Sequence, residues 1–370
     1  MNAPHLRHGG DPNGSSADGI EASAPSQTDL THPAADSAEK TATTASATRT
    51  GEISAHTGAG PVGQRSRNRT KLWLSIAACA ILVIGAAIPI ALKIRSAHSA
   101  NLSQPPHYLG VYEQGTPASY AKISAFSTAT GVTPDLIMYY SSWLEPFQAT
   151  FASTTAEHGA VPLVQINPYG VSLAAIAAGQ YDGYLTTYAE AVRSYVHPVI
   201  LSFGHEMNGH WYPWGYRHTS PTTFIAAWRH IVTLFRHMDV RNVTWLWTVN
   251  IIDPLGGIRS PTEWWPGDSY VNWVGLDGYY YEPSWTFASL FGPTIAAVRT
   301  LTHDPILIAE TGAAVDQPAK IADLFSGVHL YGLLGFVWFD AKADRDWRLT
   351  SPGAIAAFRQ QARNFSRRTS

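Results

Sequence analysis

Two glutamates in this sequence each follow directly on a strongly apolar run. Glu206 ends the segment HPVILSFGHE (197–206), and Glu310 lies in DPILIAETG (304–312). A carboxylate beside a buried strand is costly to ionise unless it has a partner. Two such carboxyl groups facing one substrate can supply the acid and the nucleophile or base that hydrolysis of a glycosidic bond requires. The alternative is that either glutamate is a structural carboxylate held by arginine or backbone donors.

Aromatic residues crowd the segment that follows Glu206. In GHEMNGHWYPWG (204–215), Trp211, Tyr212 and Trp214 come within eight positions of it. Flat aromatic faces can bury the apolar C–H faces of sugar rings, while Asn and His bind hydroxyl groups. The segment therefore favours a sugar site, and the alternative is a hydrophobic lid over the fold.

Other kinds of chemistry lack a motif. His205 and His210 are five positions apart, whereas the helical zinc motif HExxH needs four. The single Cys excludes an intramolecular disulfide framework and a zinc site built from several cysteines. No Gly-Xaa-Ser-Xaa-Gly is present, which weakens a serine hydrolase interpretation. We therefore predict neither a metal nor a cofactor.

The elements that position these residues repeat along the chain. Helical patterns separate several apolar runs, the clearest being residues 220–238, where Ser220 is a plausible N-cap followed by Pro221. Continuous apolar strands that alternate with helices predict an α/β protein with a parallel sheet, and eight units predict a (β/α)8 TIM barrel. An open doubly wound sheet is the alternative, but no Gly-rich loop follows the first run. The eight runs span 107–113, 135–143, 161–169, 197–206, 242–250, 272–281, 304–312 and 333–340.

A barrel of this kind carries its active site at the C-terminal ends of the strands. This rule selects polar and aromatic residues at the run ends. They include Glu113, Trp143, Asn167, His205, Glu206, Asn250, Asp277, Tyr279, Glu310, Trp338 and Asp340. Among the tryptophans, we expect Trp143, Trp211, Trp214 and Trp338 to line a sugar cleft.

The N-terminal part of the chain has a different composition. Residues 1–64 contain no Trp, Tyr, Phe or Cys, so they cannot bury enough apolar surface to offset the entropy of ordering. We predict a disordered tail over 1–71, a transmembrane helix over 72–92, a linker over 93–106 and the catalytic barrel over 107–370. Residues 72–92 carry no charge and as a helix would extend about 31 Å, enough to cross a bilayer. A buried soluble helix and a cleaved signal peptide are weaker alternatives, since charges bound the run sharply and a long segment precedes it.

Flanking charge predicts the orientation of that span. Four basic residues lie in 65–71 and two in 93–95, which places the tail in the cytoplasm and the barrel outside the cell membrane. The net charge of −2 argues against binding to nucleic acid. We expect a single-pass monomer whose partners are the membrane and a polysaccharide.

The chain resembles glycoside hydrolase family 26, a retaining β-glycanase family best known for β-mannanases, over about residues 107–365. The motifs that carry the resemblance are GHEMNGHWYPWG, VGLDGYYY, ILIAETGA and FVWFDAKADRDWRL. The resemblance implies that Glu206 is the general acid/base and Glu310 the nucleophile. It also implies that His205 positions the machinery beside Glu206, and that Trp211 lines the subsite next to the cleaved bond.

Further residue roles follow from the same resemblance. Tyr279 would hydrogen-bond the nucleophile, although Tyr280 could do so instead because the triple tyrosine leaves the register open. Trp338 would form the sugar platform, and Asn250 and Arg345 are weaker candidates for substrate contact.

The family resemblance implies a double displacement through a glycosyl-enzyme intermediate, with the two carboxyl groups about 5–5.5 Å apart. Family members act on β-1,4-mannan, mixed-linkage β-glucan or β-1,3-xylan. We predict an endo-acting β-glycanase, with β-1,4-mannan as the favoured substrate. The alternatives are a non-hydrolytic glycan-binding or surface-assembly protein on the same barrel, and an enzyme that trims the cell's own polysaccharide.

Overall fold

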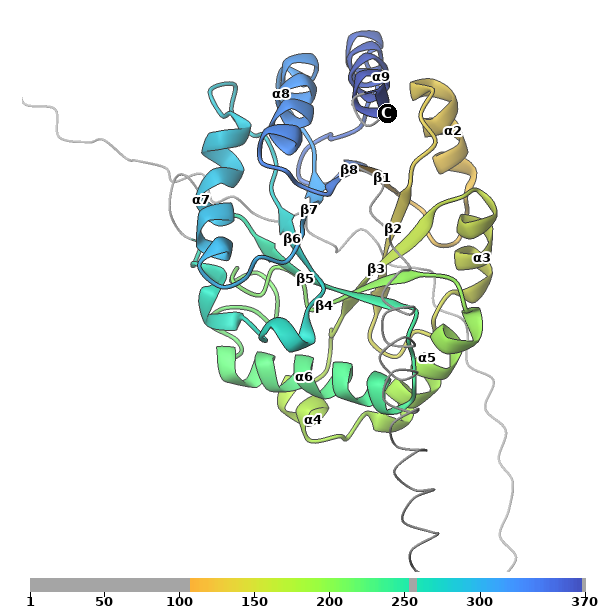
Figure 1. Cartoon of the computed structure of the whole chain (residues 1–370), viewed down its shortest axis with the longest axis vertical. Coiled ribbons are helices and arrows are strands. Elements are labelled where there is room, and N and C mark those ends of the chain that lie inside the picture. Colours follow the sequence, from red (N-terminus) through yellow and green to blue (C-terminus); the bar gives the residue numbers. More distant parts are fainter. Residues whose placement is uncertain (1–106, 253–257, 368–370) are drawn as a thin grey trace, which may run out of the picture. The chain divides into compact units, whose positions relative to one another are not determined.

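A closed barrel of eight parallel strands forms the part of the chain described by the computed structural model, residues 107–252 and 258–367. The strands neighbour one another in chain order, and helices surround them (Figure 1). This arrangement confirms the predicted (β/α)8 barrel and excludes the open sheet. The strands are β1 (Tyr108–Glu113), β2 (Leu136–Ser142), β3 (Val161–Asn167), β4 (Val199–Phe203), β5 (Val243–Asn250), β6 (Trp273–Asp277), β7 (Ile306–Thr311) and β8 (Gly335–Asp340).

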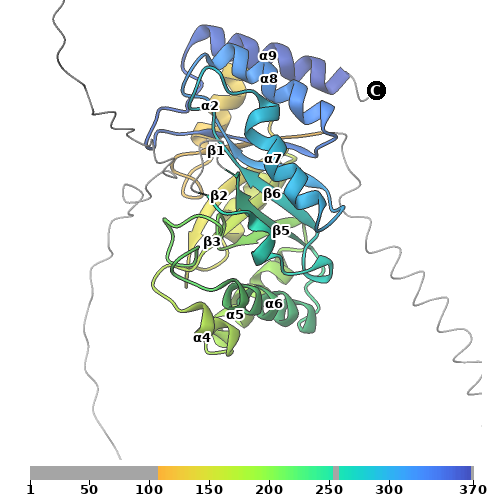
Figure 2. The same cartoon turned by 90° about the vertical axis from the view of Figure 1, so that its left-hand side faces the viewer.

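The outer helices pack on one another as well as on the strands. In Figure 2, α8 lies beside α9, and α4 and α5 pack against α6. Helix α6 has the predicted N-cap, since Ser220 Oγ accepts a 3.1 Å hydrogen bond from the N–H of Thr223. The helices are α2 (Ala121–Thr130), α3 (Ala149–Glu157), α4 (Leu173–Ala177), α5 (Asp182–Tyr195), α6 (Pro221–His237), α7 (Phe287–Arg299), α8 (Gln317–Leu330) and α9 (Pro352–Arg367), with 3-10 turns at Pro261–Trp264 and Asp268–Tyr270.

Each strand buries both of its faces. Alternate residues fill the barrel interior, such as Leu136 and Met138 of β2, while the residues between them, such as Ile137 and Tyr139, pack against the helices. This double burial explains why the strand sequences read as continuous apolar runs without an alternating pattern. It also means that the sequence does not reveal which residues face the interior.

The predicted tail, transmembrane helix and linker (1–71, 72–92 and 93–106) lie outside the described residues. Within residues 107–252 and 258–367, no helix combines the length and apolar character needed to cross a membrane.

Candidate active site

Glu206 lies three residues beyond β4, in a turn whose backbone is unusual. Both Gly204 and Glu206 have positive φ angles, +56° and +55°. A non-glycine residue in this conformation costs roughly 1–2 kcal/mol, so neighbouring contacts must hold it. The N–H of Glu206 donates to the carbonyl of Thr248 at 3.0 Å, and its own carbonyl accepts from Gly209 at 2.9 Å. The strained turn thus fixes the position of the Glu206 carboxyl group at the C-terminal ends of the strands.

Two side chains donate hydrogen bonds to the carboxyl group of Glu206. Trp211 Nε1 donates to Oε2 at 2.8 Å, and Asn250 Nδ2, at the end of β5, donates to Oε1 at 2.6 Å. Glu206 itself is only 1% exposed. Both oxygens are thus held by neutral donors in a buried environment, which fixes the orientation of the group.

Two phenols hold the carboxyl group of Glu310 in the same manner. Tyr140 of β2 donates to Oε1 at 2.6 Å, and Tyr279, two residues beyond β6, donates to Oε2 at 2.8 Å. Tyr280 takes a different direction, and its hydroxyl donates to Asp323 Oδ2 of α8 at 3.1 Å. Of the two tyrosines that the sequence left open, Tyr279 is the one in contact with Glu310.

Burial makes both glutamates weak acids. It raises the pKa of Glu206 to about 7, against the opposing hydrogen bonds from Asn250 and Trp211. For Glu310, burial and then repulsion from Glu206 raise the pKa to about 8, against the bonds from the two tyrosines. Because ionising one carboxyl group disfavours ionising the other, the pair retains a proton close to neutral pH.

Asp277 adds a third carboxyl group at the end of β6. Its backbone pairs in register with Asn250 on one side and Glu310 on the other. Burial, followed by repulsion from Glu310 and from Glu206, raises the pKa of Asp277 well above its usual range. Burial and the two neighbouring glutamates thus disfavour the ionised form of Asp277, which the sequence had placed at a strand end without giving it a role.

His205 is fully enclosed next to Glu206. Its Nδ1 lies 2.9 Å from Asn167 Oδ1 at the end of β3, and its carbonyl accepts a 2.8 Å hydrogen bond from Trp214 Nε1. Burial lowers the pKa of His205 to about 3, so the imidazole is neutral. Since Oδ1 only accepts, Nδ1 carries the proton and Nε2 is left as an acceptor. The residue thus orients the Glu206 turn without adding positive charge.

Trp338 does not form a sugar platform, contrary to the prediction. It is 0% exposed and points out of the barrel, with its ring 6.0 Å from that of Phe358 in α9. Its Nε1 donates to the carbonyl of Trp347 at 3.2 Å. The physical reason is strand alternation, because Val337 and Phe339 take the inward positions of β8.

Trp143 and Trp214 are also buried, so the expectation that they line a cleft is wrong. Trp143 is 7% exposed and packs against Tyr181 and Tyr184 beside the outer helices. Trp214 is 1% exposed and stacks on Tyr212 at 4.5 Å. Both tryptophans support the walls of the site, whereas Trp211 remains partly exposed next to Glu206.

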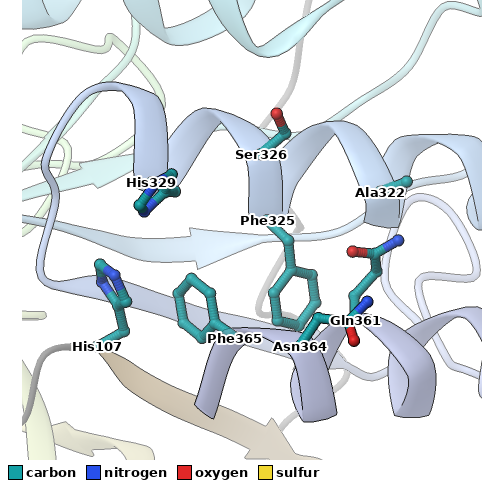
Figure 3. A pocket seen from close by; sticks show the side chains of 8 residues that line it. All are labelled: His107, Ala322, Phe325, Ser326, His329, Gln361, Asn364 and Phe365. Carbon is teal, nitrogen blue, oxygen red and sulfur yellow. The ribbon is translucent and has the colours of Figure 1, made fainter. Parts of the chain in front are cut away.

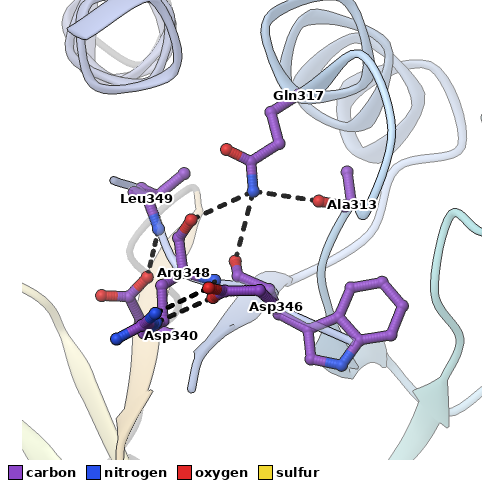
Figure 4. A network of polar contacts seen from close by, with 7 residues as sticks. Ala313, Gln317, Asp340, Asp346, Arg348 and Leu349 are labelled. Atoms are coloured by element: carbon purple, nitrogen blue, oxygen red, sulfur yellow. Dashed lines mark hydrogen bonds and ion pairs between the residues drawn. The ribbon is translucent and has the colours of Figure 1, made fainter. Parts of the chain in front are cut away.

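A network of polar contacts ties the loop after β8 to Gln317 (Figure 4). Gln317 Nε2 of α8 donates to the carbonyls of Ala313 at 2.9 Å, Arg348 at 3.1 Å and Trp347 at 3.5 Å. Trp347 packs its ring 4.7 Å from that of Tyr279. The loop therefore buttresses a phenol that holds Glu310. Arg345, a weaker candidate for substrate contact, is exposed on the same loop.

A second pair of carboxyl groups anchors that loop at its ends. Glu113 of β1 lies in register with Asp340 of β8, and Asp340 Oδ1 accepts a 2.6 Å hydrogen bond from the N–H of Leu349. Burial, then repulsion from Asp340 and a hydrogen bond that Glu113 donates to Asp340, raise the pKa of Glu113 to about 9. Arg348, paired with Asp346 at 2.6 Å, opposes this shift. Repulsion between the two carboxyl groups thus favours a proton on Glu113.

A separate hollow, which neither Glu206 nor Glu310 lines, lies between α8 and α9, and Figure 3 shows the side chains around it. It has a volume of about 280 Å³ and includes His107, which precedes β1, and His329 near the end of α8. It therefore opens at the end of the barrel where the strands begin. In the described part of the chain, no group of three or more His, Cys, Asp or Glu side chains is placed to hold a metal ion.

Comparison with known proteins places this geometry in a family. The sequence profile of glycosyl hydrolase family 26 matches residues 180–350, which contain both Glu206 and Glu310. Endoglucanase H of Acetivibrio thermocellus is 30% identical over 265 residues, covering 66% of this chain and 29% of the endoglucanase. The β-1,3-xylanase TXYA of a Vibrio species is 28% identical over 176 residues, covering 44% of this chain and 36% of the xylanase. The chain thus spans well under half of the length of either relative.

Solved structures support the fold. A GH26 β-mannanase from Bacteroides ovatus superposes with a TM-score of 0.54 at 18% identity, covering 71% of this chain and 89% of the mannanase. A modular endo-β-1,4-mannanase from Cellulomonas fimi gives a TM-score of 0.55 at 17% identity, covering 69% of this chain and 70% of that protein. These structures show the fold alone, whereas the sequence profile identifies the barrel as a glycosyl hydrolase family 26 catalytic domain.

Proposed function

We propose that this barrel is a retaining endo-β-glycanase, with Glu310 as the nucleophile and Glu206 as the acid/base. The observation that carries the proposal is the pair of buried glutamates at the C-terminal ends of β4 and β7, each held through both oxygens by two donors. A double displacement uses two carboxyl groups at one bond, one that keeps its proton and one that ionises. A separation of about 5–5.5 Å between them remains a prediction of the retaining mechanism.

In the first step, an ionised oxygen of Glu310 attacks the anomeric carbon while the bond to the leaving oxygen breaks. Glu206 gives its proton to that oxygen and becomes a carboxylate. The protonated Glu206 no longer repels Glu310, and the phenols of Tyr140 and Tyr279 favour the ionised nucleophile. One phenol must release its oxygen as the glycosyl bond forms.

In the second step, Glu206 acts as a base. It takes a proton from water, the resulting hydroxide attacks the anomeric carbon, and the bond to Glu310 breaks. Glu206 then holds a proton and Glu310 a negative charge, so both groups return to their starting states.

The substrate that we propose is an uncharged β-linked polysaccharide. The family resemblance favours β-1,4-mannan, and a 29% identical mannan endo-1,4-β-mannosidase of Bacillus subtilis matches over 92 residues. The longer match, over 265 residues, is to an endoglucanase, so a β-glucan is the second candidate. We also propose that residues 72–92 anchor the barrel on the outer side of the cell membrane, a proposal supported by the apolar run and its basic flank.

Release of reducing sugar from β-1,4-mannan, mixed-linkage β-glucan, β-1,4-glucan and β-1,3-xylan by the full chain tests the activity. Glu206→Ala and Glu310→Ala should each lose about 10²–10⁴-fold in rate. Glu190→Ala is the matched control, because Glu190 is exposed on α5. Binding to a glycan without release of sugar by the wild type would instead support the non-hydrolytic alternative.

Protease added to intact cells tests the proposed orientation in the membrane. If the barrel lies outside the cell, the protease should remove it.

A further inference from the structure

A sugar ring packs on an exposed aromatic face, which the buried Trp143, Trp214 and Trp338 do not provide. Tyr169, two residues beyond β3, is 38% exposed. Among the aromatic side chains that the structure describes, only Tyr331 is comparably exposed, and it lies at the end of α8, next to the start of β8. Tyr169 is thus the most exposed of the described aromatic residues, and it lies at the C-terminal end of the strands, where Trp211 is partly exposed.

Tyr169 is held rigidly although it is exposed. Its ring meets that of Trp214 edge-on at 4.8 Å and 73°, and that of Tyr212 at 6.2 Å and 77°. Its N–H donates to the carbonyl of Asn167 at 2.9 Å, in a turn that continues through Gly170 at a φ of +74°. The two ring contacts hold the side chain in place while more than a third of its surface remains exposed. A ring fixed in this way loses little entropy when a ligand packs on it.

The position of Tyr169 associates it with Glu206. Trp214, which supports its ring, also donates to the carbonyl of His205, the residue before Glu206. The negative charge of Glu206 contributes, after burial, to raising the pKa of the Tyr169 phenol to about 12. The ring therefore lies on the acid/base side of the cleft.

We propose that Tyr169 is the stacking platform for a sugar unit on the leaving-group side of the cleaved bond. The apolar C–H face of a pyranose ring would pack on the phenol ring, as aromatic faces favour. The acid/base must reach the leaving oxygen, so a sugar beside Glu206 belongs to the part of the substrate that departs first. This inference rests on the proposed glycanase activity and names a specificity residue for it.

A comparison of two substrates tests the proposal with the full chain. The first is an oligosaccharide of the series that the wild type cleaves, and the second is the β-glycosyl fluoride of the same sugar. The fluoride has a one-atom leaving group, so it fills the nucleophile side of the cleft and cannot reach Tyr169. Tyr169→Ala should lower kcat/KM for the oligosaccharide about tenfold and leave kcat/KM for the fluoride unchanged.

Three further variants control for structural effects. Tyr169→Phe keeps the ring and should retain the wild-type kcat/KM for both substrates. Tyr169→Leu fills the space beside Trp214 without a flat face, so it should reproduce the selective loss even if Tyr169→Ala fails to fold. Tyr331→Ala removes an exposed tyrosine at the end of α8 and should change neither rate.

The outcomes separate the platform from other roles. Equal losses on both substrates would mean that Tyr169 acts by supporting Trp214 and His205, and no loss on either would mean that no sugar packs there; each result overturns the inference. Suppose that the wild type cleaves the fluoride, and that Tyr169→Leu loses no more kcat/KM for the oligosaccharide, relative to the fluoride, than Tyr169→Phe does. The proposed role of Tyr169 as a platform is then wrong, while the glycanase proposal stands. A wild type that cleaves neither substrate would overturn the glycanase proposal and the platform with it.

Discussion

The hydroxyl of Tyr140 donates a 2.6 Å hydrogen bond to Oε1 of Glu310, although the two residues are 170 positions apart in the chain. Tyr140 belongs to β2 and Glu310 to β7, so closure of the barrel brings them together. With Tyr279 on the other oxygen, this bond makes the environment of Glu310 a matched pair of phenols. Hydrogen bonds to an ionised carboxylate favour that form and lower its pKa.

Removing the Tyr140 hydroxyl should therefore raise the pKa of Glu310. In Tyr140→Phe, we expect the acidic limb of the pH profile of kcat/KM to move up by about one unit, since a bond to a charged group contributes about 1.5–3 kcal/mol and part of it is replaced by water. The control is Tyr139→Phe, because Tyr139 faces the outer layer and packs on Phe151. An unchanged acidic limb in Tyr140→Phe would contradict the assigned role.

The indole of Trp211 should control the alkaline limb of the pH profile of kcat/KM. Trp211→Phe keeps an aromatic ring but removes the N–H that donates to Glu206 Oε2. That bond lowers the pKa of Glu206, so its loss should raise the pKa and move the alkaline limb of kcat/KM upward, while the acidic limb moves less. Rates measured across about pH 4 to 10 would show this. A shift of the alkaline limb downward would be the opposite of what the hydrogen bond requires.

The carboxyl pair of Glu113 and Asp340 should make stability depend on pH. The folded state raises the pKa of Glu113 from 4.5 to about 9, so between these values the folded protein binds a proton that the unfolded chain does not. The contribution of this group to the free energy of unfolding is therefore greatest below about pH 4.5 and decreases as pH rises towards about 9. In Glu113→Gln, the free energy of unfolding measured with urea should fall less between about pH 4.5 and pH 9 than it does in the wild type. Glu190→Gln should behave like the wild type. If the free energy of unfolding depended on pH in the same way in both variants, Glu113 would not be the cause of that dependence.

Trp338 should matter for folding rather than for sugar binding. Trp338→Ala removes a fully buried ring between β8 and α9, which should reduce the free energy of unfolding by about 3–5 kcal/mol. Trp338→Phe should recover part of that stability and keep the wild-type KM, as measured by denaturant unfolding and by initial rates. A large rise in KM for Trp338→Phe with little change in stability would restore the platform that the sequence predicted.

Strand alternation explains why some site residues could be identified from the sequence and others could not. Glu206 and Glu310 stand out because a carboxyl group after an apolar run is unusual, whatever direction it takes. Tyr140 lies in LIMYYSS, where its neighbour Tyr139 is equally aromatic and faces the other way. Trp338 was misplaced for the same reason, since both faces of β8 are apolar.

The sequence by itself determined the eight apolar runs, the helices between them and the two glutamates at strand ends, because these depend on local hydrophobic pattern and on conspicuous charge. Only the tertiary structure decided that Tyr140 and Tyr279 hold Glu310, that Trp338 faces α9, and that Tyr169 stays open beside Glu206. In a parallel barrel both faces of every strand are buried, so the sequence carries no period that tells inside from outside. Barrel closure, which joins residues far apart in the chain, makes that choice.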